Sequence, residues 1–348
     1  MFNCFLNLCY DKDVKVNIFH WKKRQGSVKR LNAKQKLLVI IGPTAVGKTK
    51  LSIEMAKLFN GEIISGDSMQ IYRGMDIGTA KITKDEMEGI PHYLLDIKEP
   101  DENFSVAEFQ YLVRDKITEI AKKGKLPIIV GGTGLYIQSV IYDYQFADVP
   151  GDEALRHKLE ERLKEIGTDA LYKELQEIDP ESAGQIHPNN SRRVIRALEI
   201  YYLTGKTRQE YQNTQQSELL YDSAIIGLTM DRELLYERIN TRVDIMVKEG
   251  LLDEVKSLYN RGLRDCQSIQ AIGYKEIYQY LDGDIPFEQA TETLKQNSRR
   301  YAKRQLTWFR NKMDVKWFDV TDVNNFSQKI KEISQYVEGK LRVKSNTY

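Results

Sequence analysis

The sequence is poor in cysteine and in long hydrophobic runs. Only three cysteines occur in 348 residues. No two of them form a CxxC pair, and three thiolates are too few for a typical structural zinc site. Such sparse cysteine suits a reducing cytosol. No apolar run approaches the roughly 20 residues of a transmembrane helix, and the N-terminal stretch lacks the basic start of a secretory signal. We therefore expect a cytoplasmic protein without a membrane partner.

An excess of charge of either sign is also absent. The net charge of +2 neither requires nor excludes a polyanionic partner, so binding of nucleic acid would depend on local clusters. One cluster, HWKKRQGSVKR, lies in residues 1–33, which we interpret as a poorly ordered leader or an upstream extension of the reading frame. The alternative is a basic arm that touches nucleic acid. We expect the core to begin near Lys34.

Strands and helices alternate between residues 34 and 144. Ser105 is a credible N-cap and Gly124 a stop for a helix between two of the strands. The alternation predicts a doubly wound, parallel α/β sheet with right-handed crossovers. The expected strands are KLLVIIG (36–42), GEIISGD (61–67), HYLLDI (92–97) and LPIIVGG (126–132).

The pattern becomes helical after residue 144. No strand pattern interrupts residues 145–219, so we expect a helical insertion domain there. The apolar segment SAIIGLTM (223–230) predicts a strand that returns to the sheet, and helical patterns resume over residues 232–312. The α/β core therefore comprises residues 34–144 and 220–316, with helices in its C-terminal part. We expect residues 317–348 to form a peripheral tail.

A glycine-rich loop joins the first expected strand to a helix. GPTAVGKT matches the pattern G-x-x-x-x-G-K-[ST], in which backbone N–H groups and a helix N-terminus bind phosphate. Lys48 can neutralise a terminal phosphate, and the Thr49 hydroxyl is placed to ligate Mg²⁺. The motif predicts a P-loop NTPase-like core but does not say what the phosphates are attached to. The loop residues are Gly42, Pro43, Thr44, Ala45, Val46, Gly47, Lys48 and Thr49.

An acidic residue is missing where a P-loop NTPase needs one. Such enzymes use an acid at the end of a neighbouring strand to hold the metal and position the nucleophile, but LPIIVGGTG ends in glycines and a threonine. Asp96 lies in what we interpret as an ordinary acidic loop. Asp67 ends the second expected strand beside the phosphate loop and is the best-placed carboxylate. A strand-end cap or a metal ligand is the alternative interpretation of Asp67.

Several specific motifs follow one another in the order of a known family. SGDSMQIYRGMDIGTAK, after the GPTAVGKT loop, resembles the tRNA dimethylallyltransferases, also called tRNA isopentenyltransferases. The resemblance continues through PHYLLDI, IIVGGTGLYI, IHPNNSRRVIRALEI, QAIGYKE and YAKRQLTWFR, and extends roughly from Leu37 to Arg310. Cys266 is the last cysteine, so the chain resembles the bacterial form, without the C-terminal zinc finger of eukaryotic members.

The resemblance implies transfer of the dimethylallyl group of dimethylallyl diphosphate to N6 of adenosine 37, beside the tRNA anticodon, with release of diphosphate. The phosphate loop would then hold an isoprenoid diphosphate instead of ATP, with Mg²⁺ on Thr49. Asp67 would be the general base. Lys48, Thr133 and Arg242 would act at the diphosphate or the reacting centre. We expect a monomer whose partners are tRNA and dimethylallyl diphosphate.

The resemblance also implies where tRNA binds. A base must leave the anticodon loop to reach the site, and the helical insertion would grip the anticodon stem-loop. The implied tRNA contacts are Asp67, Ser68, Met69, Gln70, Thr133, Gly134, Arg192, Arg193, Val194, Ile195, Arg196, Gln270, Gly273 and Lys275. In the basic segment 297–312 we expect several basic residues to contact phosphates, and the aromatic residues Tyr301, Trp308 and Phe309 to pack in the core.

Three other functions share part of this pattern. A kinase of nucleosides or small metabolites would use the same loop and Mg²⁺ ligand, but would leave the basic C-terminal helix and the arginine-bearing insertion unexplained. An isopentenyltransferase of free adenine nucleotides would not need an insertion that grips tRNA. A nucleotide-dependent RNA-binding switch would hydrolyse or exchange nucleotide and leave no label on RNA.

Overall fold

The computed structural model describes residues 34–144, 152–207, 210 and 218–346. The leader expected at residues 1–33 and parts of the expected insertion lie outside these ranges. Cys266, within them, is a free and partly buried cysteine. Among the described helices, none is both long enough and apolar enough to cross a membrane.

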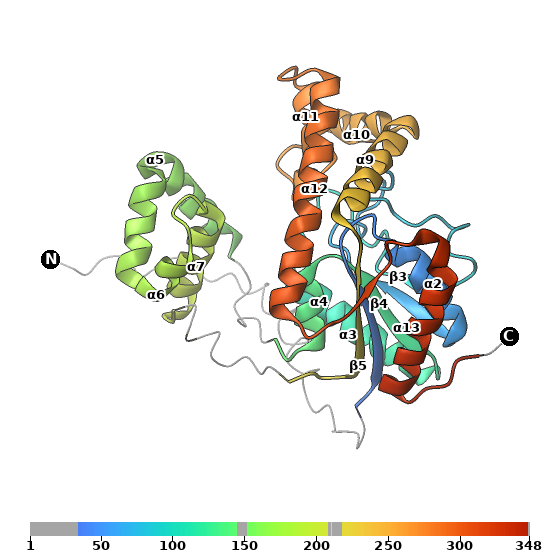
Figure 1. Ribbon diagram of the computed structural model, residues 1–348. Coiled ribbons are helices and arrows are strands. Elements are labelled where there is room, and N and C mark those ends of the chain that lie inside the picture. The colour runs from blue at the N-terminus through green and yellow to red at the C-terminus, as the bar shows by residue number, and fades with distance from the viewer. Residues whose placement is uncertain (1–33, 145–151, 208–209, 211–217, 347–348) are drawn as a thin grey trace. The chain divides into compact units, whose positions relative to one another are not determined.

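A six-stranded parallel sheet forms the centre of the α/β core (Figure 1). The strands are β1 (Lys36–Ile41), β2 (Gly61–Ser65), β3 (His92–Tyr93), β4 (Leu126–Gly131), β5 (Asp222–Thr229) and β6 (Lys316–Asp319). Their order is β3-β2-β4-β1-β5-β6, and all neighbours pair in parallel. Parallel sheets are buried on both faces, which explains the continuous apolar runs of β1 and β5. The predicted doubly wound α/β fold is confirmed.

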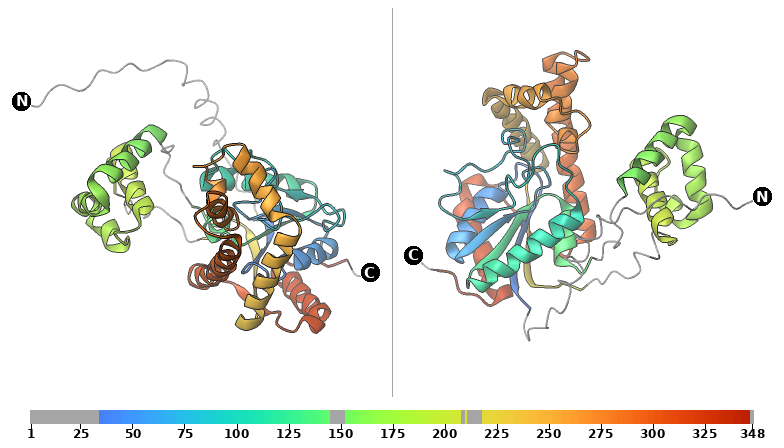
Figure 2. Two further views of the ribbon diagram at one scale, coloured as in Figure 1. Left: turned by 90° about the horizontal axis from the view of Figure 1, so that it is seen from above. Right: turned by 180° about the vertical axis from the view of Figure 1, so that it is seen from behind.

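Helices cover both faces of the sheet. They are α2 (Lys48–Leu58) and α13 (Phe326–Leu341) on one face, and α3 (Val106–Lys122) and α4 (Gly134–Ile141) on the other (Figures 1 and 2). Successive side chains of a strand point to opposite faces. Leu38 of β1 therefore packs with α2 and α13, whereas Val39 packs with α3 and α4. The predicted N-cap of α3 is confirmed, because the Ser105 side chain accepts a hydrogen bond from the Glu108 N–H.

The third strand is much shorter than the sequence predicts. Residues 92–97 are expected to be extended, but only His92–Tyr93 pairs with β2. Leu94 and Asp96 have φ values of 61° and 53°, which turn the chain away from the sheet. β3 is an edge strand with one neighbour, so apolar composition alone did not keep the following residues in the ladder.

Residues 317–341 are part of the core, although residues 317–348 were expected to form a peripheral tail. β6 pairs with β5 along the edge of the sheet. Ile333, Val337 and Leu341 of α13 are fully buried in the cluster that covers α2. Their spacing of four residues places all three on one face of the helix, and this stripe is visible in the sequence.

Four helices after β5 extend the core, as expected for residues 232–312. They are α9 (Arg232–Lys248), α10 (Leu251–Asn260), α11 (Tyr274–Leu281) and α12 (Phe287–Lys312). A short 3₁₀ turn, η2 (Ser268–Gln270), precedes α11, and another, η3 (Val323–Asn325), follows β6. Each helix buries apolar residues in the hydrophobic cluster that also contains Val39 of β1. The long α12 lies against both α9 and α4, so it passes close to the edge where the strands end.

The described part of the expected insertion is a small helical bundle with a core of its own. Its helices are α5 (Glu153–Ile178), α6 (Pro180–Gln185) and α7 (Ser191–Thr204). Leu171, Leu175 and Leu198 are fully buried among them. α5 is interrupted at Gly167, whose φ of 79° is not helical. In the described residues this segment contains helices and no strand, as the pattern predicts.

The carboxyl ends of the parallel strands lie at one edge of the sheet. The loops that follow β1, β2 and β4 therefore approach one another, as is usual for ligand sites in this class of fold. The approach is very close between β2 and β4, because a Cβ on Gly131 would lie 2.3 Å from the carbonyl oxygen of Gly66. Only a glycine allows this packing of backbone on backbone.

The substitution Gly131→Ala should therefore destabilise the core. Overpacking against rigid backbone typically costs about 1–3 kcal/mol, and the urea midpoint should fall accordingly. Gly339→Ala is the matched control, because Gly339 lies in α13 with open space around its Cβ position. That change should stabilise the helix by up to about 1 kcal/mol. A Gly131→Ala protein that unfolds at the urea concentration of the parent would contradict this account.

Candidate functional site

The phosphate loop has the backbone that its sequence predicts. It follows β1, turns at Gly42 and Gly47 with φ values of 149° and 104°, and opens α2. A Cβ on Gly42 would lie 2.8 Å from the carbonyl oxygen of Leu228, so the loop also packs tightly on β5. Ala45 and Val46 are buried, while Thr49 is exposed in the first turn of α2. The helix N-terminus and the loop N–H groups form a binding place for an anion.

Lys48 is the main titratable group of the loop. Its Nζ donates hydrogen bonds to the carbonyl oxygens of Gly42 and Pro43, at 3.0 and 2.8 Å. Burial of the ammonium, followed by repulsion from Arg242, lowers the pKa of Lys48 to about 7, although the Asp67 carboxylate opposes the shift. Because the positive charge is costly there without a ligand, an anion bound to the loop would be strongly favoured.

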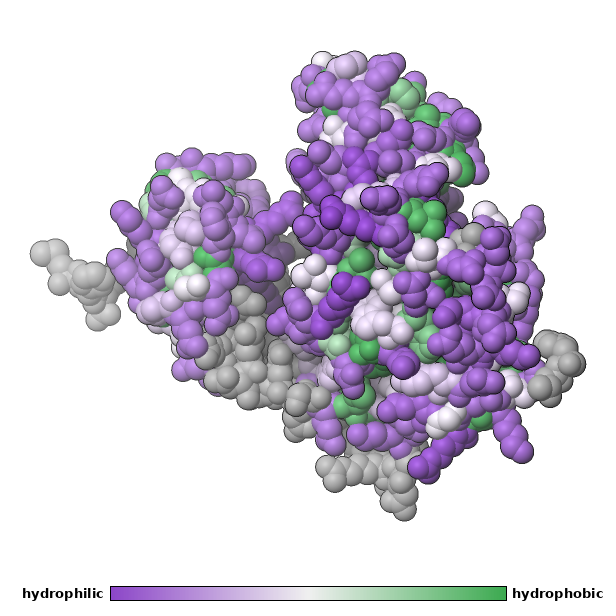
Figure 3. Space-filling view, in the orientation of Figure 1, coloured by the Kyte–Doolittle hydropathy of each residue, from purple (hydrophilic) through white to green (hydrophobic). Residues whose placement is uncertain are grey.

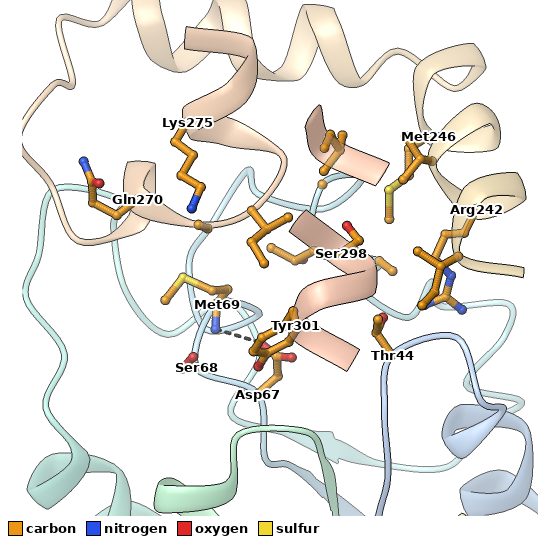
Figure 4. Close-up of a pocket in the computed structure, with 18 of the residues that line it drawn as sticks. Thr44, Asp67, Ser68, Met69, Arg242, Met246, Gln270, Lys275, Ser298 and Tyr301 are labelled. Carbon is orange, nitrogen blue, oxygen red and sulfur yellow. Dashed lines mark hydrogen bonds between the residues drawn. The ribbon is translucent and has the colours of Figure 1, made fainter. Parts of the chain in front are cut away.

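Asp67 follows β2 and is the carboxylate that could act together with this loop. Its Oδ1 accepts a hydrogen bond from the Met69 N–H at 2.8 Å (Figure 4). Burial raises the pKa of Asp67, while the Met69 N–H, Lys48 and Gln70 lower it. Although β4 lies between β2 and β1, Asp67 lines the same cavity as Thr44, Lys48 and Thr49, so it lies beside the phosphate loop as expected. It also interacts electrostatically with Lys48.

Two residues of α12 complete this region, and neither was expected in the site. The Gln305 Oε1 accepts a hydrogen bond from the Thr44 N–H at 2.9 Å, and its Nε2 donates one to the Gly132 carbonyl oxygen at 3.0 Å. The Tyr301 phenol is hydrogen-bonded to Thr133 and Gln305. Burial and the Asp67 charge raise the pKa of Tyr301 to about 12. The phenol therefore stays protonated beside Asp67 at neutral pH.

The aromatic residues of α12 have different roles from one another. Phe309 is fully buried, as expected, and Trp308 packs against the same core. Tyr301 does not pack in the core, because it lines the cavity next to Asp67 (Figure 4). The expectation of a core position is therefore wrong for Tyr301.

Two chambers meet at Asp67. The large chamber, of about 330 Å³, has a mainly apolar wall of Met69, Ile239, Val243, Met246, Ile272 and Leu294. The small chamber, of about 110 Å³, is bounded by polar groups that include Lys48, Thr49, Ser52, Ser65, Gln70 and His92. Both chambers are lined by Thr44, Asp67, Thr79, Ala80, Arg242 and Tyr301. The Asp67 carboxylate would therefore face both an anion in the small chamber and an apolar or aromatic group in the large one.

Arg242 of α9 faces the same junction. It points toward Thr44 in Figure 4 and lines both chambers. Burial, and then repulsion from Arg238, lowers the pKa of Arg242, while Glu86 opposes the shift. A guanidinium remains charged despite such a shift, so the junction holds two cationic side chains, Arg242 and Lys48, close to one carboxylate.

The other expected site residues of the core fall into two groups. Ser68, Met69, Gln270 and Lys275 line the large chamber. Gln70 lines the small chamber, and its Nε2 donates hydrogen bonds to the carbonyl oxygens of Thr79 and Ala80.

Outside the phosphate loop and the helical bundle, three expected residues line neither chamber. The Thr133 Oγ1 accepts a hydrogen bond from the Ser68 N–H at 3.3 Å and so supports the wall from behind. Gly134 packs under Trp308, since a Cβ there would lie 2.1 Å from the indole ring. Gly273 is the N-cap of α11, with a φ of 103°.

The arginine-bearing helix α7 places its expected residues on two different sides. Arg192 and Arg193 are exposed, but the side chains of Val194 and Ile195 are buried in the core of the helical bundle. Those two side chains cannot meet an RNA unless that core opens. Arg196 forms an ion pair with the fully buried carboxylate of Glu199 at 2.9 Å, so part of its charge serves the bundle itself.

A divalent metal could be held mainly by the phosphate oxygens of a bound diphosphate. Within the described residues, no group of three or more histidine, cysteine, aspartate or glutamate side chains is arranged to bind a metal. The small chamber offers the Thr49 hydroxyl and the Asp67 carboxylate. Mg²⁺ is usually bound by one or two protein oxygens together with phosphate oxygens and water. The residues therefore fit an ion that arrives with a diphosphate.

Basic residues are exposed along α12. Arg300, Lys303, Arg304 and Arg310 are all exposed to solvent, and hydrophilic residues predominate over this helix on the face seen in Figure 3. Arg304 also lines the large chamber. A polyanion could therefore follow α12 to the mouth of that chamber.

Comparison with known proteins agrees with this geometry. The family model described as IPP transferase matches residues 70–312. The tRNA dimethylallyltransferase of Bacillus cytotoxicus is 66% identical over 313 residues, which are 90% of this chain and 98% of the relative. The solved tRNA isopentenylpyrophosphate transferase of Bacillus halodurans has a TM-score of 0.68 at 60% identity, over 89% of this chain and 97% of that one. A eukaryotic dimethylallyltransferase, described as acting on tRNA, has a TM-score of 0.76 at 35% identity, over 86% and 77%.

The pKa of Lys48 predicts how anion binding depends on pH. In the free protein Lys48 loses its proton near pH 7, whereas a bound pyrophosphate favours the ammonium. Above pH 7 binding must therefore take up a proton, and the pyrophosphate Kd should rise by up to roughly tenfold per pH unit. Calorimetry from about pH 6 to about pH 9 would measure this dependence.

Lys48→Arg is the control for the titration of pyrophosphate itself, because arginine stays charged throughout this range. The profile of this variant should be flatter than that of the parent. Parallel profiles would show that Lys48 does not titrate near neutral pH.

Proposed function

The chain belongs to the IPP transferase family, and on that premise we propose that it transfers the dimethylallyl group of dimethylallyl diphosphate to N6 of adenosine 37 in a tRNA. The observation that carries the proposal is the position of Asp67 at the junction of a polar chamber beside the phosphate loop and a larger, mainly apolar one. In the reaction the C1–O bond of the donor breaks, an N6–C1 bond forms, one N6 proton moves to Asp67, and diphosphate leaves.

The donor diphosphate is held in the small chamber. The loop N–H groups and the Lys48 ammonium face the phosphate oxygens, and the donor's C1 then lies toward Asp67. Negative charge grows on the leaving oxygen as the C1–O bond breaks. Lys48 and Arg242, both largely removed from water, stabilise that charge more strongly than they could in solvent.

The acceptor adenine occupies the large chamber. A base in an anticodon loop must unstack to enter, at a cost of a few kcal/mol. The apolar wall compensates by contact with the faces of the base, and Ser68, Gln270 and Lys275 offer polar groups to its edge and backbone. Arg304 and the exposed basic residues of α12 hold the phosphates that follow.

Asp67 is the general base. The lone pair of N6 is delocalised into the ring, so the nitrogen attacks well only as its proton is removed. Burial raises the pKa of Asp67, which makes the carboxylate a stronger base than an exposed one. The hydrogen bond from the Met69 N–H fixes its orientation. Tyr301, protonated at neutral pH, lines both chambers beside Asp67.

Mg²⁺ fits the small chamber through the Thr49 hydroxyl and the donor's own phosphate oxygens. When bound, the ion neutralises charge on the leaving diphosphate. The Thr49 hydroxyl, in the first turn of α2, would be the protein group that holds the ion. Thr133, which lines neither chamber, acts as a positioning residue through its hydrogen bonds with Ser68 and Tyr301.

The rival functions explain less of the structure. A small-molecule kinase would need an acid at the carboxyl end of β4, where Gly131 and Gly132 stand. A transferase for free adenine nucleotides would not need the basic α12 or the exposed Arg192 and Arg193. We propose a monomer that acts on tRNA in the cytoplasm.

A transfer assay separates these functions. Radiolabelled dimethylallyl diphosphate is incubated with Mg²⁺ and unmodified tRNA, with AMP as an alternative acceptor and ATP as an alternative phosphate donor. We expect label on tRNA and none on AMP. Label on AMP alone would assign the chain to the free-nucleotide enzymes, and consumption of ATP without transfer would assign it to the kinases.

Asp67→Asn tests the base directly. Asparagine keeps the size of the side chain and an oxygen that accepts from the Met69 N–H, but it cannot take up the N6 proton. We expect kcat to fall by about 10²–10⁴-fold, while tRNA binding measured by filter retention stays within about twofold of the parent. Asp101→Asn, at an exposed turn, should change neither quantity. Undiminished turnover in Asp67→Asn would remove this residue from the base role.

A further inference from the structure

A carboxylate outside both chambers holds one wall of the large chamber. Glu254, in the first turn of α10, accepts four hydrogen bonds. Its Oε2 accepts from the backbone N–H groups of Asp76 and Ile77, both at 2.8 Å. Its Oε1 accepts from the Gly78 N–H at 2.9 Å and from the Tyr274 hydroxyl at 2.6 Å. Nearly all the acceptor capacity of this carboxylate is therefore used, with three consecutive N–H groups on one side.

The segment that Glu254 holds leads straight into the chamber wall. Gly78, Thr79 and Ala80 line the large chamber, and they follow the first two N–H groups that Glu254 accepts from. On their other side, the Gln70 side chain donates hydrogen bonds to the carbonyl oxygens of Thr79 and Ala80. The wall is thus fixed at its N–H groups by α10 and at its carbonyl groups by the segment that carries Asp67.

Tyr274 connects the same carboxylate to a second, adjoining wall. Its side chain is fully buried, and its ring lies against Gly78, where a Cβ would be 2.6 Å from a ring carbon. Burial and the charge of Glu254 raise the pKa of Tyr274, so its hydroxyl remains a donor. Gln270, Ala271, Ile272 and Lys275, close to it in sequence, line the large chamber. Glu254 therefore joins two walls that come from distant parts of the chain.

We propose that Glu254 is a positioning residue that sets the separation of these two walls, and with it the fit of the acceptor base. The inference rests on the proposed function, in which the large chamber receives the base. A carboxylate suits the position because it accepts at both oxygens and is stabilised by several N–H donors. Glutamine of the same size would turn an NH₂ group toward N–H donors and leave at least one of them without an acceptor.

Glu254→Gln tests the proposal, with Asp253→Asn as the matched control. Both residues lie in the first turn of α10, so both changes remove one charge near the same helix N-terminus, but Asp253 is exposed. We expect Glu254→Gln to lower kcat/KM for tRNA by about tenfold. The Kd for pyrophosphate, whose loop is not held by Glu254, should stay within about twofold of the parent. Asp253→Asn should match the parent in both measurements.

Tyr274→Phe provides a second test that does not depend on the stability of Glu254→Gln. It removes one of the four donors and keeps the ring against Gly78, so kcat/KM for tRNA should fall by a few fold, roughly what one lost hydrogen bond allows. Thermal unfolding and pyrophosphate binding report whether each variant is folded.

The outcomes separate this inference from the proposed function. Absence of transfer by the parent protein overturns the proposed function. A parent that transfers while Glu254→Gln and Tyr274→Phe match it in kcat/KM overturns the positioning role. The positioning role is also overturned if transfer and pyrophosphate binding fall together in proportion to the loss of folded protein. A selective loss of kcat/KM for tRNA, with pyrophosphate binding retained, supports it.

Discussion

The amide of Gln305 is the interaction on which the rest of the site depends. Its oxygen accepts from the Thr44 N–H of the phosphate loop, and its nitrogen donates to the Gly132 carbonyl oxygen after β4. One buried side chain of α12 thus fixes two of the loops at the carboxyl edge of the sheet. Tyr301, one turn earlier on the same helix, is thereby placed beside Asp67. The bridge ties α12 directly to the phosphate loop, in addition to the apolar packing that holds the helices after β5 on the core.

Electrostatic balance at the junction of the chambers follows from that arrangement. Two cationic side chains, Lys48 and Arg242, and one carboxylate, Asp67, line the same small chamber. Burial lowers the pKa of Lys48 and Arg242 and raises that of Asp67, so each group is less stable in its charged form than in solvent. A diphosphate supplies the missing negative charge. The free protein is therefore poised for an anionic ligand, and the base becomes useful only when that ligand is present.

Much of this could be predicted from the sequence where the signal is local. The strand, loop and helix around Lys48 are continuous in sequence, from Lys36 to Leu58, and Asp67 follows a recognisable strand. The role of Gln305 could not be predicted in the same way, because its partner Thr44 lies in a distant part of the chain and no local sequence pattern indicates the contact. The position of Tyr301 could not be predicted either, and a core position was expected. An aromatic residue in a helix has the same local pattern whether its side chain faces a cavity or the core. The short β3 depended on its position at the edge of the sheet, and the structural role of α13 depended on the face of the sheet that it covers.

The strand order also has a consequence for how the protein folds. β1 pairs with β4 on one side and with β5 on the other, and Val39 lies opposite Ile225. The strand that carries the phosphate loop therefore completes its pairing only after the whole helical segment has been synthesised. α13, which covers α2, follows later still. Closing such long loops is slow and exposes apolar strands in the meantime. The helical bundle has its own core and can fold first, so it would be native while the catalytic sheet is still incomplete on the ribosome.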